Sequence, residues 1–171
     1  MRSISRISLG VAASAVLVGS FALPASAVDT TATVEVPVGS LAISAPVSAD
    51  LATITPGGSA TASLTGVKVT DNRAGEAGWA AQVVLDDFVG TTPTNVISST
   101  AATYAPGTAV TDGTVSVAAT TQSDLSAAKT VQAASGVVGN NTAEWAADLS
   151  VTAPSDALAD TYTATLTHSV L

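Results

Sequence analysis

Short runs in which apolar and polar residues alternate recur along the chain, separated by Gly, Pro, Asp or Asn. The clearest example is residues 67–85, where two alternating runs flank a turn-forming segment that contains Asp71, Asn72 and two glycines. Successive side chains of a β-strand point to opposite faces, so each run predicts a strand with one apolar face. We therefore expect residues 67–85 to form a β-hairpin closed by a longer loop.

Further alternating runs extend this pattern over the rest of the chain. They cover residues 33–38, 41–43, 59–64, 96–104, 114–117, 130–133, 142–151 and 162–171. Eight or nine short strands joined by turns predict an all-β fold, an antiparallel β-sandwich. The best helical signal is one short turn at residues 123–129, with Ser123 as its cap. Gly139, Asn140 and Asn141 predict a turn before the strand that contains Trp145.

The core of such a sandwich is predicted to consist mainly of Ala and Val, which are small. The few aromatic residues must then fill the space between the sheets, because each buries on the order of 150–250 Å². We expect Trp79, Trp145 and Tyr162 to be mostly structural.

Residues 1–27 have the pattern of a secretory signal peptide. Arg2 and Arg6 precede an apolar run, which ends at the small residues Ala25, Ser26 and Ala27. We therefore expect a mature chain from Val28, with residues 28–171 forming a single domain. No later apolar run is long enough to cross a membrane, and no covalent sorting motif is evident.

Charge and cysteine content restrict the partners. The chain has 5 basic and 13 acidic residues, a formal net charge of −8, and no cysteine. Removal of Arg2 and Arg6 with the signal peptide would leave a net charge of −10. So acidic a chain is not expected to bind nucleic acid or anionic lipid, because both require Lys and Arg.

The inventory of reactive side chains argues against an enzyme. The only histidine, His168, alternates onto an apolar strand face, and no nucleophile elbow accompanies it. Asp71, Glu76 and the Asp86–Asp87 pair could supply the two carboxylates of a glycosidase, but the chain has few aromatics for stacking a sugar. We expect no catalytic residue.

No cofactor is expected, and calcium is the one ion that the loop after residue 70 leaves open. Asp71, Asn72 and Glu76 would offer oxygen ligands, although their spacing differs from that of an EF-hand. An ordinary Asx turn is the alternative interpretation of the same residues.

Residues 69–79, which run from Val69 through Asp71 and Arg73 to Trp79, and residues 162–171 at the end of the sequence carry two motifs. These motifs resemble those of the WxL surface domain of Gram-positive bacteria, and the likeness spans most of residues 28–171. In that family, a Val-Thr-Asp-x-Arg loop leads into a first Trp-x-Leu, and a Tyr-x-x-Thr-Leu-Thr-Trp-x-Leu ends the chain. Ala81 stands where the first motif has Leu, and His168 and Val170 stand where the second has Trp and Leu. The candidate binding residues that the resemblance implies are Asp71, Arg73, Gly78, Trp79, Tyr162, Thr165, Leu166 and His168.

The resemblance implies an exported, non-enzymatic protein that associates non-covalently with the cell wall, with peptidoglycan or another wall component as its ligand. Membrane-tethered or other surface proteins would be further partners, and the expected location is the cell wall or cell surface. The alternative hypothesis is a structural or adhesin-type subunit that assembles with itself or with other surface proteins through exposed strand edges.

Overall fold

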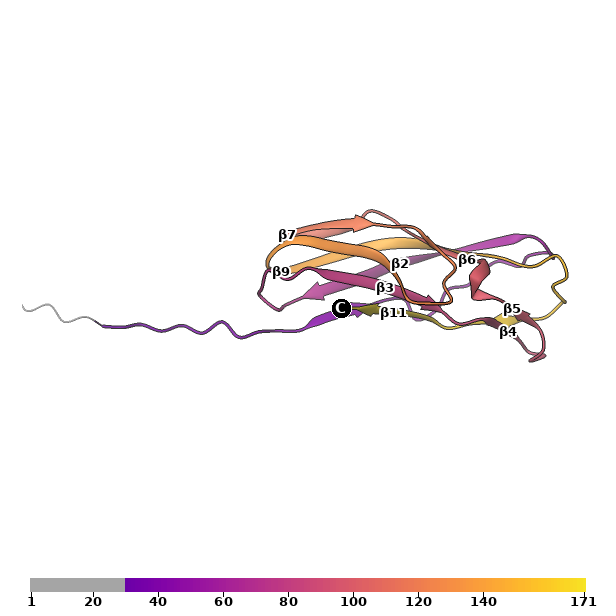
Figure 1. Cartoon of the computed structure of the whole chain (residues 1–171), viewed down its shortest axis with the longest axis horizontal. Helices are drawn as coiled ribbons and strands as arrows, with labels where there is room; N and C mark the ends of the chain where they lie inside the picture. Colours follow the sequence, from indigo (N-terminus) through magenta and orange to yellow (C-terminus); the bar gives the residue numbers. More distant parts are fainter. Residues whose placement is uncertain (1–29) are drawn as a thin grey trace, which may run out of the picture. The chain divides into compact units, whose positions relative to one another are not determined.

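The computed structural model describes residues 30–171, and almost all of its regular structure is β-sheet (Figure 1). Glu35–Leu171 forms one compact unit. The predicted signal peptide and its cleavage site lie outside the described residues. In the part of the chain that is described, no helix is long and apolar enough to cross a membrane.

Eleven strands and one 3₁₀ turn make up the described fold. They are β1 (Leu41–Ser44), β2 (Ser59–Asp71), β3 (Trp79–Leu85), β4 (Phe88–Gly90), β5 (Val96–Ile97), η1 (Ser99–Ala101), β6 (Ala102–Pro106), β7 (Val110–Ala119), β8 (Gln122–Ser123), β9 (Lys129–Thr152), β10 (Tyr162–Thr163) and β11 (Leu166–Val170).

The strands form an eight-stranded and a three-stranded antiparallel sheet. The large sheet follows the path β1-β2-β9-β3-β11, with β6 and β7 also on β9 and β8 on β6; the small sheet is β10-β4-β5. At the two ends of the path, β1 and β11 lie against each other, so the large sheet nearly closes on itself. The predicted all-β, antiparallel, sandwich-like fold is confirmed.

The hairpin predicted for residues 67–85 is wrong, because β2 and β3 do not pair with each other. Both pair with β9: β2 lies along residues 141–152, and β3 along residues 129–134. The inward faces of the two strands were nevertheless predicted correctly. Val67, Val69, Trp79, Ala81, Val83 and Leu85 are all buried.

The long strand β9 replaces two predicted strands and the turn between them. The turn expected at Asn140 and Asn141 is wrong, since β7 pairs with β9 on both sides of Gly139. Gly136 and Gly139 have φ of 61° and 72°. Glycine adopts this left-handed conformation without steric cost, so the strand can change direction without ending.

Two smaller predictions are also wrong. Residues 123–129 form no helix: Ser123 ends β8, Lys129 begins β9, and the residues between them form turns with Asp124 at φ 57°. The buried Leu125 ties these turns to Ser99 and Leu85 by backbone hydrogen bonds. Residues 33–38 form no strand, because no neighbouring strand pairs with them.

A bulge in β2 sets the orientation of the residues that follow it. Ala60, Ala62 and Leu64 are buried, and the register shifts between Leu64 and Val67, where Gly66 has φ 79°. The extra residue restores the inward orientation for Val67, Val69 and Asp71. Asp71 therefore enters the core face and needs buried partners.

The pairing of β2 with β9 predicts that Thr61→Cys and Ser150→Cys together form a disulfide. The two residues face each other, and Thr61 Oγ1 donates a hydrogen bond to Ser150 Oγ at 3.1 Å. Because the bridge would close a long loop, thermal unfolding under oxidising conditions should shift upward by several degrees relative to the reduced variant. Thr61→Cys with Glu144→Cys, placed further along β9, is the control and should stay reduced.

Candidate functional site

Four of the eight candidate residues meet in a hydrogen-bonded network at the end of β2. Arg73 Nε and Nη2 donate to the two carboxylate oxygens of Asp71, each at 2.9 Å. The backbone N–H of Arg73 also donates to Asp71 Oδ1, at 3.0 Å. The carboxylate is 2 % exposed and the Arg73 side chain 28 %. This two-pronged ion pair holds one loop conformation, because the planar guanidinium fits the carboxylate in a single orientation.

Asn141 joins the ion pair to Trp79. Its amide nitrogen donates to Asp71 Oδ2 and to the carbonyl oxygen of Gly139, both at 3.3 Å. Its amide oxygen accepts the indole N–H of Trp79 at 3.1 Å. Every polar side chain in this buried group thus has a partner, which a low-dielectric site requires.

The same arginine fixes the loop between β2 and β3. Arg73 Nη2 donates to the carbonyl oxygens of Ala77 and Gly78, both at 3.1 Å. A Cβ at Gly78 would overlap the carbonyl oxygen of Ala134, so only glycine lets the loop approach β9 this closely. Residues 74–78 remain exposed. The network presents this loop while Asp71 and Trp79 themselves are buried.

The carboxylate oxygens of Asp71, considered above as calcium ligands, form an ion pair instead. Asp71 is paired with Arg73, and a guanidinium competes with a cation for the same carboxylate. Among residues 30–171, no group of three or more His, Asp or Glu side chains is arranged to hold a metal ion.

His168 lies in the middle of β11 and packs on a buried tyrosine. Its ring meets that of Tyr104 edge-on, with centroids 5.7 Å apart. The Tyr104 hydroxyl lies 3.2 Å from His168 Nε2 and accepts the indole N–H of Trp145 at 3.4 Å. Because Trp145 can only donate, the hydroxyl proton is free to donate to a neutral His168.

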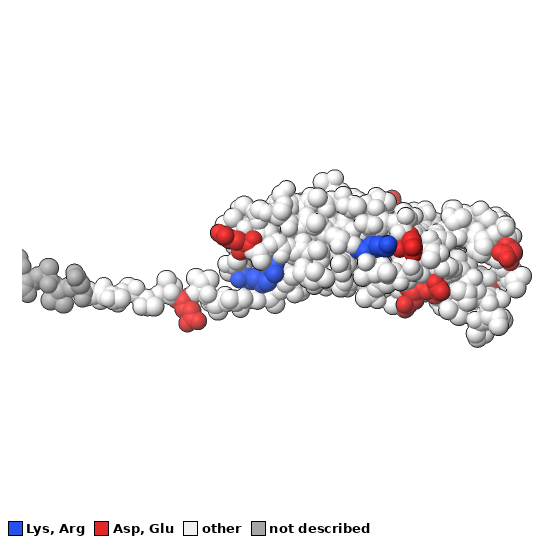
Figure 2. All heavy atoms as spheres, in the orientation of Figure 1, with Lys and Arg blue, Asp and Glu red and all other residues white. Residues whose placement is uncertain are grey.

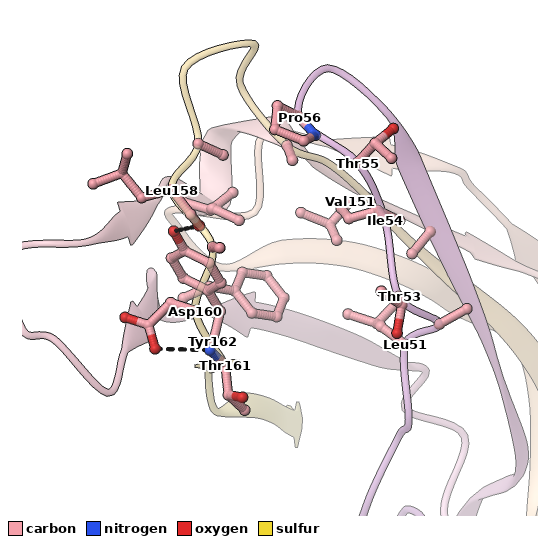
Figure 3. Close-up of a pocket in the computed structure, with 17 residues that line it drawn as sticks. Leu51, Thr53, Ile54, Thr55, Pro56, Val151, Leu158, Asp160, Thr161 and Tyr162 are labelled. Carbon is pink, nitrogen blue, oxygen red and sulfur yellow. Dashed lines mark hydrogen bonds between the residues drawn. The ribbon is translucent and has the colours of Figure 1, made fainter.

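Tyr162, Thr165 and Leu166 lie toward the other end of the sandwich. Tyr162 lines a cavity of about 420 Å³ between residues 51–56 and 157–162 (Figure 3). Its hydroxyl donates to the carbonyl oxygen of Leu158 at 2.8 Å. Thr165 is exposed, and Leu166 lines an adjoining cavity of about 550 Å³.

The candidate residues therefore form separate groups and not one site. Ala60, near the start of β2, lines the cavity of Tyr162, whereas Asp71 ends the same strand. At about 3.3 Å per residue, the 13 residues of β2 span roughly 40 Å.

Sequence reasoning missed Asn141, Tyr104 and Asp160. Asp160 accepts the Thr91 hydroxyl, the side-chain amide of Asn95 and the backbone N–H groups of Thr91, Thr92 and Thr161. These bonds, that of the Thr91 hydroxyl above all, hold its carboxyl pKa well below the usual value. It thereby fixes the 91–95 loop beside β10. No sequence motif marks these three residues, since their partners lie far away in the chain.

Charged groups are sparse on the face that Figure 2 shows, where neutral atoms cover most of the surface. Glu76 is exposed in the loop itself, and Lys68 and Glu144, on neighbouring strands, pair at 3.6 Å and are about half exposed. A ligand for this surface would be recognised mainly by neutral polar groups and shape.

No model of a protein family matches the chain, and a search of curated proteins finds no match. The resemblance to the WxL domain stays a prediction.

Asp71→Asn should destabilise the fold by about 2 kcal/mol, because it leaves the Arg73 guanidinium without its counter-charge. Hydrogen bonds from the Arg73 side chain hold the pKa of Asp71 below its usual value. The carboxylate therefore stabilises the fold above the pKa of about 3.9 that it has when unfolded, and this contribution is lost as pH falls through the folded pKa. Urea unfolding at pH 7 and at pH 3 should give a smaller difference between variant and wild type at the lower pH. An equal difference at both would contradict this role of the ion pair.

His168 should make stability depend on pH between about 7 and 5. Burial lowers its pKa, so the unfolded chain takes up a proton first, near its ordinary pKa of about 6.5. Stability is then complete above pH 6.5 and declines below it. His168→Phe should lower the melting temperature at pH 7.5. Between pH 7.5 and pH 5, the melting temperature of this variant should fall by less than that of the wild type. A fall as steep as that of the wild type would show that His168 is not the titrating group.

Proposed function

We propose that the chain is an exported, non-enzymatic protein that associates non-covalently with the peptidoglycan of a Gram-positive cell wall. The signal-peptide pattern and the two resembling motifs support export and wall association. The observation on which the proposal chiefly depends is the buried network of Asp71, Arg73, Asn141 and Trp79, which holds residues 74–78 exposed in one conformation.

The placement of the matched residues supports a positioning role for them. Asp71 and Trp79 are 2 % and 3 % exposed, so a wall ligand would contact the loop that they support and not their side chains. The loop is built of Ala, Gly and one Glu, and its carbonyl oxygens at Gly75, Ala77 and Gly78 are hydrogen-bonded within the chain. The remaining backbone groups, among them the N–H and C=O of Glu76, are left to bind a ligand. Amide and sugar groups of peptidoglycan are suitable partners for such groups.

The surroundings of His168 favour a non-enzymatic function. Its Nε2 lies against the Tyr104 hydroxyl, and burial lowers the pKa of the ring. Among the described residues, no serine hydroxyl is hydrogen-bonded to His168, which a nucleophilic triad would require.

The test is co-sedimentation of the exported chain with purified cell walls, with intact walls and acid-stripped walls side by side. We expect binding to both, since an acidic chain gains nothing from the anionic polymers that acid removes. Glu76→Arg with Ala77→Asp changes only exposed loop side chains and should weaken binding at least tenfold. The matched control, Asp112→Arg with Ala118→Asp on the exposed face of β7, should bind like the wild type.

Absence of wild-type binding at every salt concentration would reject the proposed function. Equal binding by the loop variant and the β7 control would reject the loop as the contact surface.

A further inference from the structure

We propose that residues 33–38 of one copy of this chain add as a β-strand to an apolar groove in a second copy. The inference goes beyond wall association, because it assigns a self-assembly site. It depends on an unpaired strand-like segment, on a groove with an unpaired backbone edge, and on the distance between them within one chain.

Residues 33–38 have the sequence pattern of a strand but no partner strand. Val34, Val36 and Val38 are 89 %, 74 % and 82 % exposed, and they alternate with Thr33, Glu35 and Pro37. In an extended conformation the three valines share one face. An apolar strip of this kind on an exposed segment is typical of an interaction surface.

The groove lies where the large sheet fails to close. Beyond Ser44 the chain leaves β1 and continues without regular structure to Ser59, facing residues 157–166. The cavities of about 420 and 550 Å³ lie along this gap and share Leu51, Phe88, Thr161 and Tyr162 in their walls. Figure 3 shows the first of the two. The lining of the first cavity is predominantly aliphatic and aromatic, which suits valine side chains, whereas that of the second is about half polar.

One wall of the groove also offers backbone hydrogen-bonding groups. Residues 46–54 take part in no backbone–backbone hydrogen bond within the described chain. An added strand could pair with them, as in other cases of strand addition to a free edge.

The position of Pro37 agrees with pairing along a single edge. In a strand, the backbone groups of alternate residues point to opposite edges. If the valine residues pair with the groove wall, Thr33, Glu35 and Pro37 point their backbone groups to the other edge. The missing N–H of Pro37 then interrupts no ladder.

The segment cannot reach the groove of its own chain. Gly39 N–H donates to the Asn72 carbonyl at 3.1 Å, which fixes the base of the segment beside the end of β2. The cavities border Leu64 and Ala60, roughly 26 and 40 Å back along that strand at about 3.3 Å per residue. Val34 can extend only roughly 17 Å from Gly39 by the same measure. The occupant must therefore come from a second copy.

Such a contact joins two different surfaces, one at each end of β2. A heterologous contact of this type adds copies head to tail and forms an open chain unless the geometry closes a ring. The exported chain should then form oligomers whose size grows with concentration.

Because the chain contains no cysteine, the contact can be tested by mixing single-cysteine variants. Val36→Cys and Ala157→Cys, which lines the groove, should form a disulfide-linked heterodimer on mild oxidation. The control mixture pairs Val36→Cys with Ala118→Cys on the exposed face of β7. We expect at least tenfold more heterodimer in the groove mixture; equal yields would overturn the proposal.

Light scattering provides a second readout. The mass of the wild type should rise with concentration, while the triple variant Val34→Thr, Val36→Thr and Val38→Thr should remain monomeric with an unchanged circular dichroism spectrum. A wild type that is monomeric throughout, or a triple variant that assembles equally well, would refute the inference. The triple variant should still co-sediment with cell walls, so failure of assembly and failure of wall binding can be distinguished.

Discussion

The fold depends on one strand, β9, which runs for 24 residues and pairs on both of its edges. Every other strand of the eight-stranded sheet pairs with β9 or with a strand that does. One sheet can therefore wrap around one core, because β9 continues through the irregular stretch at Gly136 and Gly139, where Val138 still pairs with Thr114. The chain has no disulfide to replace this connection.

A core of small residues needs a few large ones, and their polar atoms need partners. Trp79, Trp145 and Tyr104 are buried, and their N–H and O–H groups are satisfied by Asn141, by one another and by His168. These side chains lie in two groups along the sandwich. The first supports the exposed loop after Asp71, and the second joins β11 to the strands that carry Tyr104 and Trp145.

The inward faces of the strands could be predicted from the sequence because alternation is a local property. Trp145, Ala147, Leu149 and Val151 are buried, as their spacing indicates. The pairing could not be predicted, since the partners of β2 lie as far as 93 residues away, at Ser59 and Thr152. The hairpin prediction failed for this reason. A turn-rich loop can join two strands that pair with each other, but it can equally join two strands that both pair with a third.

The candidate site was predictable only in part. Asp71, Arg73, Gly78 and Trp79 do converge, yet Asn141, which connects them, has no signal in the sequence beyond its place near two glycines. The groove beside Tyr162 was missed because it forms between two segments without regular structure, where no periodicity exists to detect. The alternating pattern of residues 33–38 predicts a strand, but within one chain this segment has no strand to pair with.

The central claim, that β9 organises the fold while residues 46–54 stay unpaired, is tested most directly by amide hydrogen exchange on the dilute chain from Val28. Peptides from β9, β2 and β3 should exchange together as the slowest group, while peptides from residues 46–54 should exchange rapidly. Slow exchange in residues 46–54, or fast exchange in residues 147–151, which pair on both edges of β9, would contradict this claim.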